Sequence, residues 1–158
     1  MSKNIYGLTD LTNEAVVEVI RRKFLSEADT NPNLYDPIDV QRCRSEDWQI
    51  ERFLIEKGTP DEALGALIRA MKWKKSFGVH ERAHHYFPRE MFLIFGNEKF
   101  SRDRGGTLCS WGVNRNYKKI PELSKLIKQY IVFQMERGDR KAGNKGIITI
   151  SDCNVSLN

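Results

Sequence analysis

The residues with the most enzyme-like spacing are His80-Glu81-Arg82-Ala83-His84, which match the pattern H-E-x-x-H. On one helix this spacing puts two imidazoles a turn apart with a glutamate beside them, as zinc hydrolases require. Gly78 lies just before the string and Pro88 shortly after it, and no H-x-x-G-x-x-H continuation follows. We therefore expect a solvated loop without a metal, and a zinc hydrolase stays a remote alternative.

Two other groups of residues are weaker candidates for chemistry. The segment 102–106 (Arg-Asp-Arg-Gly-Gly) lacks the glycine spacing and the Lys-Ser/Thr pair of a phosphate-binding loop, and it precedes a strand, so we expect a tight hairpin-like turn. Ser110 and Ser151 fall in expected strands with no patterned His partner, so neither is an activated nucleophile. We expect no catalytic residue, no metal ligand and no cofactor, and the protein is not predicted to be an enzyme.

The elements that position these residues begin with a series of helices. Asp36 can cap a short helix that Pro37 starts, and Thr59-Pro60-Asp61-Glu62 has the pattern of a capping box at the start of a helix that ends near Phe77-Gly78. Apolar residues recur at helical spacing, and Gly58 is expected to end one helix. The remaining expected helices span residues 13–27 and 45–58, with a short apolar segment at 90–95. The front half is thus predicted to be a helical bundle.

The periodicity changes after this bundle. Residues 107–113 read as a strand, 121–137 as a long amphipathic helix and 146–151 as a second, β-branched strand. A strand, a crossover helix and a strand predict a parallel, right-handed pair. Such sheets need several strands, so we expect an α/β fold whose mixed sheet is incomplete and whose remaining strands lie beyond residue 158.

Length, composition and charge limit the class of protein further. The chain has 158 residues, 40% of them apolar, and a net charge of +5, and neither a membrane span nor a signal peptide is apparent. Its odd number of cysteines, Cys43, Cys109 and Cys153, is typical of reduced thiols, which predicts a cytosolic protein. Residues 61–158 carry 18 Lys and Arg against 10 Asp and Glu, an excess that favours a phospholipid surface or nucleic acid as partner. A solvated surface is the alternative.

Taken in order, several motifs resemble the CRAL-TRIO (Sec14-like) lipid-binding domain. They are Arg52-Phe53-Leu54, the helix ending in Trp73-Lys74-Lys75, the Asp103-x-Gly-Gly turn and the strand ending in Ile150-Ser151-Asp152. Tyr35-Asp36-Pro37, Phe77-Gly78-Val79 and Phe87-Pro88-Arg89 look most like the motile-sperm-domain proteins that carry this module. Lys74 and Ser151 depart from the family, which commonly has Arg and a bulky apolar residue at these positions.

The resemblance implies a helical N-terminal region at residues 1–95 and the start of a lipid-binding α/β domain at 96–158, truncated within the domain. It implies a phospholipid or another small hydrophobic ligand, a possible membrane surface and no nucleic acid. It also implies action at the cytoplasmic face of a membrane such as the endoplasmic reticulum, with impaired binding in this truncated chain. The family uses the second strand as pocket floor, so the expected pocket lining is Thr149 and Ser151, with Leu108 or Trp111 from the first strand.

One alternative function and one physical consequence stay open. The helical front could instead dock a protein partner, in which case the chain would be an interaction or membrane-tethering module without lipid transfer. If the sheet is incomplete, apolar surface should be exposed around residues 147–155, and the chain should be unstable or prone to aggregation.

Overall fold

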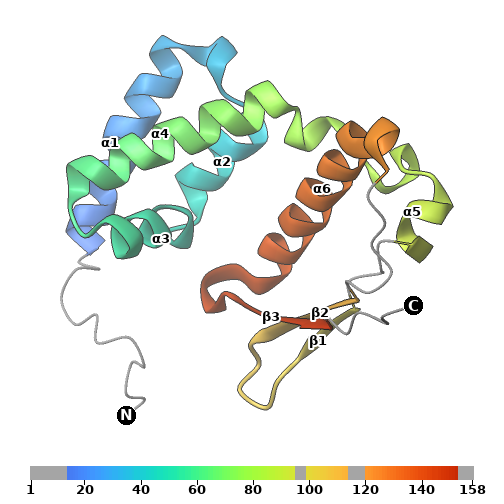
Figure 1. Cartoon of the computed structure of the whole chain (residues 1–158). Coiled ribbons are helices and arrows are strands. Elements are labelled where there is room, and N and C mark those ends of the chain that lie inside the picture. Colours follow the sequence, from blue (N-terminus) through green and yellow to red (C-terminus); the bar gives the residue numbers. More distant parts are fainter. Residues whose placement is uncertain (1–13, 95–98, 114–119, 153–158) are drawn as a thin grey trace. The chain divides into compact units, whose positions relative to one another are not determined.

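The computed structural model of this protein describes residues 14–94, 99–113 and 120–152 (Figure 1). The chain packs into two compact units, Met1–His80 and Glu81–Asn158. The first unit is helical and the second contains a small mixed sheet, so the fold belongs to the α/β class. The domain boundary expected between residues 95 and 96 follows from the family resemblance, and it stays a prediction.

Four α-helices build the part of the first unit that the structure describes, residues 14–80, and the predicted bundle is confirmed. Asp36 caps α2 as expected, because its carboxylate accepts a hydrogen bond from the backbone N–H of Ile38 at 3.0 Å. Gly58 and Gly78 adopt left-handed conformations and end α3 and α4. The bounds are α1 Glu14–Thr30, α2 Pro37–Ser45, α3 Trp48–Lys57 and α4 Pro60–Phe77, with a short 3-10 turn, η1, at Pro32–Leu34.

Two details of the helix starts differ from the predictions. Ser45 ends α2 instead of starting the next helix, which begins at Trp48. The Thr59 side chain does not bond the backbone of α4; its hydroxyl donates to the carboxylate of Glu62 at 2.7 Å. The predicted capping box was therefore wrong, because the two side chains satisfy each other directly.

The core of the first unit is contributed by all four helices. Phe24 is fully buried and meets the ring of Tyr35 edge-on, with 5.5 Å between centroids. The Tyr35 hydroxyl and the Lys72 ammonium both donate to Glu27 Oε1, at 3.0 and 2.9 Å. The other buried apolar residues packed in this cluster are Val17, Ile20, Ala28, Cys43, Ile50, Leu54, Ala63, Leu67 and Met71.

The second unit contains the predicted β-α-β arrangement. Strands β2 and β3 pair in parallel, with Leu108 opposite Ile147 and Ser110 opposite Thr149, and α6 connects them. A strand that the sequence analysis did not predict, β1, pairs antiparallel to β2 through the expected tight turn. The bounds are α5 Arg89–Ile94, β1 Lys99–Arg102, β2 Leu108–Val113, α6 Ser124–Ala142 and β3 Ile147–Asp152, with 3-10 turns at Val79–Glu81, His84–Tyr86, Pro121–Leu123 and Gly143–Lys145.

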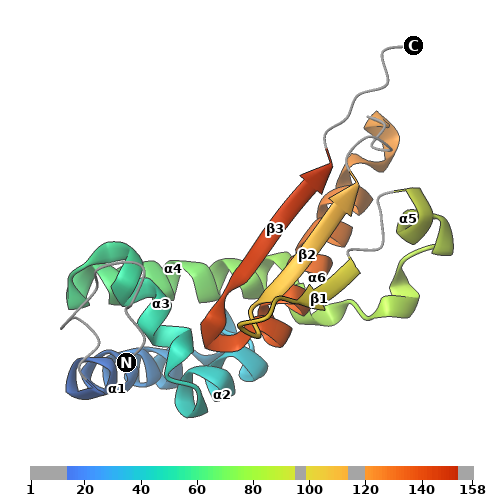
Figure 2. The same ribbon diagram turned by 90° about the horizontal axis from the view of Figure 1, so that it is seen from below.

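Helix α6 lies along one face of this sheet (Figures 1 and 2). The approach is closest at Gly138, where a Cβ atom would lie 2.9 Å from Cδ1 of Ile147 and 3.2 Å from the Phe100 ring. At the other end of α6, Ile127 and Tyr130 pack against Phe87, Met91 and Phe92. The sheet order is β1-β2-β3, so β3 is an edge strand among the described residues.

Candidate functional site

The sheet has a covered face and an exposed face, because side chains alternate along each strand. The contact of Ile147 with Gly138 identifies the covered face. Leu108 and Thr149 share that face by register; Leu108 is only 3% exposed, whereas Thr149 is exposed. Ser151 pairs with Gly112 in the same register, but its side chain lies outside the described residues.

Trp111 lies on the opposite face. It is 46% exposed and pairs with Ile150, which is 42% exposed, while the neighbouring pair joins Cys109 to Ile148, which is 45% exposed. We call Cys109, Trp111, Ile148 and Ile150 the bare face. Figure 2 looks onto this face, and no described helix of the second unit crosses it there.

The four residues expected to line a pocket therefore do not share one surface. Leu108 and Thr149 face α6, whereas Trp111 belongs to the bare face. The apolar exposure expected near the second strand is confirmed for Ile147, Ile148 and Ile150, whereas residues 153–155 lie outside the described part of the chain. Sequence reasoning did not choose Ile148 and Ile150 as lining residues. Their signal was the alternation of β3 itself, which puts both isoleucines opposite the polar Thr149.

The two edges of the sheet differ in chemistry. Strand β1 is short and ends in an exposed basic residue, Arg102, which discourages pairing with another chain. Strand β3 is longer, and its first five residues, Ile-Ile-Thr-Ile-Ser, carry no charge and no proline. Strand β3 thus has no charged side chain along its first five residues and exposes apolar side chains on one face. Both features are typical of a surface that contacts an apolar partner.

The histidines of the H-E-x-x-H string do not lie on one helix. His80 belongs to the 3-10 turn Val79–Glu81 and His84 to a separate 3-10 turn, His84–Tyr86. The side chain of His80 is 3% exposed and its Nε2 lies 2.8 Å from Asp39 Oδ2. The ring of His84 stacks on Phe92 with 4.2 Å between centroids. The local geometry that a zinc hydrolase needs from this string is absent from the described structure.

His80 is instead part of a buried polar cluster in the first unit, which we call the Asp39 cluster: Asp39, Lys74 and His80. The ammonium of Lys74 donates to Asp39 Oδ1 at 2.8 Å, and Asp39 is 2% exposed. Burial acts to raise the pKa of Asp39, but the adjacent His80 imidazole and Lys74 ammonium outweigh it, so the pKa is lowered from its ordinary value of 3.8. An ionised carboxylate thus joins α2 to the end of α4 and to the following turn.

The thiol of Cys43 is buried, and we expect it to react slowly in the folded state. Burial and the negative charge of Asp39 raise its pKa from the ordinary 9.0 to about 12. The thiolate population at neutral pH is therefore lower by roughly a thousandfold. We predict that a thiol reagent labels Cys109, which is partly exposed, long before Cys43, and that urea removes the difference. Reaction kinetics resolved by peptide mass spectrometry check this, and equal native rates would contradict it.

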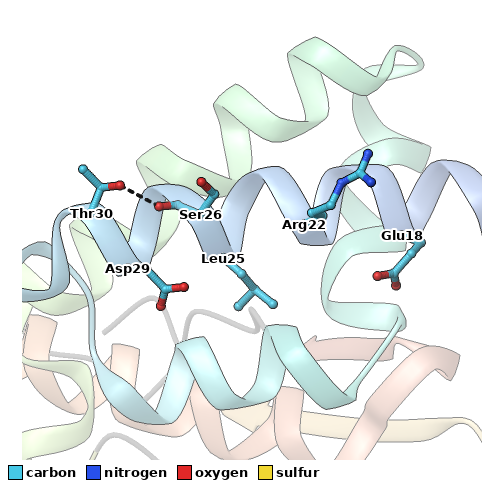
Figure 3. Close-up of a pocket in the computed structure, with 6 residues that line it drawn as sticks. All are labelled: Glu18, Arg22, Leu25, Ser26, Asp29 and Thr30. Atoms are coloured by element: carbon cyan, nitrogen blue, oxygen red, sulfur yellow. Dashed lines mark hydrogen bonds between the residues drawn. The ribbon is translucent and has the colours of Figure 1, made fainter.

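A surface depression of about 520 Å³ lies along α1 in the first unit (Figure 3). Its lining comes from a single face of this helix, and the Thr30 hydroxyl donates to the Ser26 carbonyl at 2.9 Å. The lining has one apolar residue and no converging set of donors or acceptors, so it suits neither a lipid tail nor catalysis. The residues are Glu18, Arg22, Leu25, Ser26, Asp29 and Thr30.

Ser110 also carries no catalytic arrangement. It is 3% exposed, and its hydroxyl has no hydrogen-bond partner among the described residues. A serine nucleophile requires a base within hydrogen-bond reach. Ser110 therefore acts as a small buried residue of the covered face.

Comparison with known proteins gives no relative: no family model, no curated protein and no solved structure matches this chain. None of the described helices is both long and apolar enough to cross a lipid bilayer.

Proposed function

We propose that this chain is a non-enzymatic lipid-binding module whose bare face contacts the hydrocarbon of a phospholipid or another small hydrophobic ligand. The observation that carries the proposal is the row of exposed apolar side chains opposite α6, formed by Trp111, Ile148 and Ile150. Exposed, contiguous apolar surface of this kind marks sites for apolar partners. The resemblance of the ordered motifs to the CRAL-TRIO domain, in which lipid lies against the sheet, supports the same function.

The lining proposed now differs in part from the sequence-based expectation. Trp111 is retained, and Cys109, Ile148 and Ile150 join it. Leu108, which is buried, and Thr149, which is exposed, lie on the α6 side of the sheet. Each methylene of an acyl chain buried against such a face contributes about 0.8 kcal/mol, so several are needed for useful affinity.

Quenching of tryptophan fluorescence tests this proposal. Phosphatidylcholine with brominated acyl chains is expected to quench the emission of Trp111, because bromine quenches only at close contact. Trp111→Phe should abolish most of the quenching. Trp73→Phe is the matched control, since Trp73 is also exposed, at 50%, but belongs to α4, where it stacks on Phe77. Quenching that survives Trp111→Phe and disappears in Trp73→Phe would place the lipid contact on the helical unit and refute the proposal.

A further inference from the structure

A group of cations gathers where the β1–β2 turn meets the end of α6, at the margin of the bare face. We call Arg102, Arg104, Lys141 and Lys145 the hairpin-end cluster. All four belong to the second unit and are exposed. They lie next to the residues where β2 and β3 begin, immediately before Cys109 and Ile148 of the bare face.

Backbone carbonyls hold two of these cations in place. The guanidinium of Arg102 donates to the carbonyl of Gly106 at 2.6 Å and to that of Lys141 at 2.9 Å, which joins the turn to α6. The ammonium of Lys145 donates to the carbonyl of Gly105 at 3.2 Å. A carbonyl oxygen orients a cation without cancelling its charge, so the positive field at this end of the sheet is retained.

Lys141 is fixed in a different way, because its ammonium lies 4.9 Å from the centroid of the Phe100 ring. The acid of the turn, Asp103, is engaged locally, and its Oδ1 accepts a hydrogen bond from the Thr107 N–H at 2.7 Å. Within the described residues, none of the four cations forms an ion pair, whereas Glu136 on the same helix pairs with Arg140 at 3.1 Å. Four cations thus outnumber the single carboxylate of the turn, Asp103, so this end of the sheet carries a net positive charge.

We propose that the hairpin-end cluster docks the chain on an anionic phospholipid membrane, with the bare face toward the lipid. This inference rests on the proposed function, because the membrane is the source of the hydrophobic ligand. A basic rim beside an apolar surface matches a leaflet in which anionic headgroups border hydrocarbon, and each nearby Lys or Arg adds to the attraction. Charge complementarity thus favours anionic membranes over neutral ones and orients the second unit with its bare face toward the lipid.

Sedimentation of the full chain with vesicles tests the docking. The variant Arg104→Gln/Lys141→Gln/Lys145→Gln retains Arg102, which ties the turn to α6. The control variant Arg89→Gln/Lys125→Gln/Lys128→Gln removes the same formal charge from exposed positions elsewhere in the second unit. Adding phosphatidylserine to phosphatidylcholine vesicles should strengthen binding of the unaltered chain, and high salt should reverse the gain.

The cluster variant is expected to bind the anionic vesicles roughly a hundredfold more weakly, and the control variant less than about fivefold more weakly. If the cluster variant is misfolded by circular dichroism, Arg104→Gln alone, at the exposed tip of the turn, should still weaken binding about fivefold. Equal losses in both triple variants, or no dependence on phosphatidylserine, would overturn the proposal. Tighter binding to single-stranded RNA than to anionic vesicles would also overturn it. Quenching of Trp111 by neutral brominated lipid tests the proposed function separately, because binding of a neutral lipid does not need the positive charges of the hairpin-end cluster.

Discussion

Replacing Asp39 with Ala is expected to lower the free energy of unfolding by about 3–5 kcal/mol, as is typical when one partner of a buried ion pair is removed. Asp39 is 2% exposed, and the Lys74 side chain that bonds it is only 12% exposed. The variant keeps the buried ammonium but removes the carboxylate that stabilises its charge. Urea unfolding monitored by circular dichroism measures the change.

Asp61→Ala is the matched control, because Asp61 forms an exposed ion pair with Lys23 at 3.2 Å. Exposed pairs contribute about 0–1 kcal/mol, so this variant should unfold almost as the unaltered chain does. Similar losses in the two variants would show that the Asp39 cluster does not stabilise the first unit.

The loss in the Asp39 variant should depend on pH with a defined sign. The pKa of Asp39 is lowered in the folded state, so its contribution is fully present above the ordinary value of 3.8. The contribution is lost as the pH falls through the lower, folded pKa. The difference in stability between Asp39→Ala and the unaltered chain should therefore be large at neutral pH and shrink in strong acid. A difference that grows on acidification would contradict the assignment of an ionised Asp39.

The second large effect is expected at Ile150. Ile150→Lys places an ammonium in the centre of the bare face, and a charge brought against hydrocarbon costs about 2.5–3.5 kcal/mol. Binding to neutral phosphatidylcholine vesicles should therefore weaken roughly a hundredfold. Because Ile150 is 42% exposed in the folded chain, stability should change little. A flotation assay with fluorescent lipid measures the affinity.

Ile131→Lys provides a closely matched comparison. Ile131 is 46% exposed, but it lies on α6, which covers the other face of the sheet. The same substitution there should leave lipid affinity within a factor of about two, since no lipid contact is lost. If both lysine variants bind equally well, or both lose binding equally, the bare face is not the lipid contact.

Local sequence signals predicted much of the secondary structure. Asp36 before Pro37 and the left-handed Gly58 and Gly78 act within one helical turn of their own positions, so the sequence alone is informative there. The β-branched segment of β3 and the amphipathic α6 likewise predicted the parallel β-α-β unit. The incomplete sheet and the tendency to aggregate stay predictions.

Features that depend on distant partners were not predictable in the same way. Strand β1 has Phe100 as its one apolar residue, and it becomes a strand only because β2 pairs with it. The Asp39 cluster joins Asp39 to Lys74, which lies 35 positions away in the sequence, so no local sequence pattern predicts it. The environment of His80 was not predictable for the same reason, since it contacts a buried carboxylate of α2 and not the second histidine of its own string.

The pocket lining was predicted from the alternation of side chains along the strands. Alternation separates the residues of β3 into two faces, but it does not say which face α6 covers. Choosing Thr149 and Ser151 relied on the family resemblance, whereas placing Ile147 against Gly138 required the packing of α6. Once that contact is known, the exposed isoleucines of β3 identify the opposite face. The lining expected at Thr149 and Ser151 stays a prediction.

Protection of Cys109 by lipid is the most direct test of the central claim, because its side chain belongs to the bare face. The measurement uses a Cys153→Ser chain, in which buried Cys43 is expected to stay unreacted in the folded state and serves as an internal standard. We predict that phosphatidylcholine vesicles slow the alkylation of Cys109 in proportion to the fraction of chain bound, while Cys43 stays unlabelled. An unchanged alkylation rate for Cys109, at lipid concentrations where the chain sediments with the vesicles, would contradict lipid binding at the bare face.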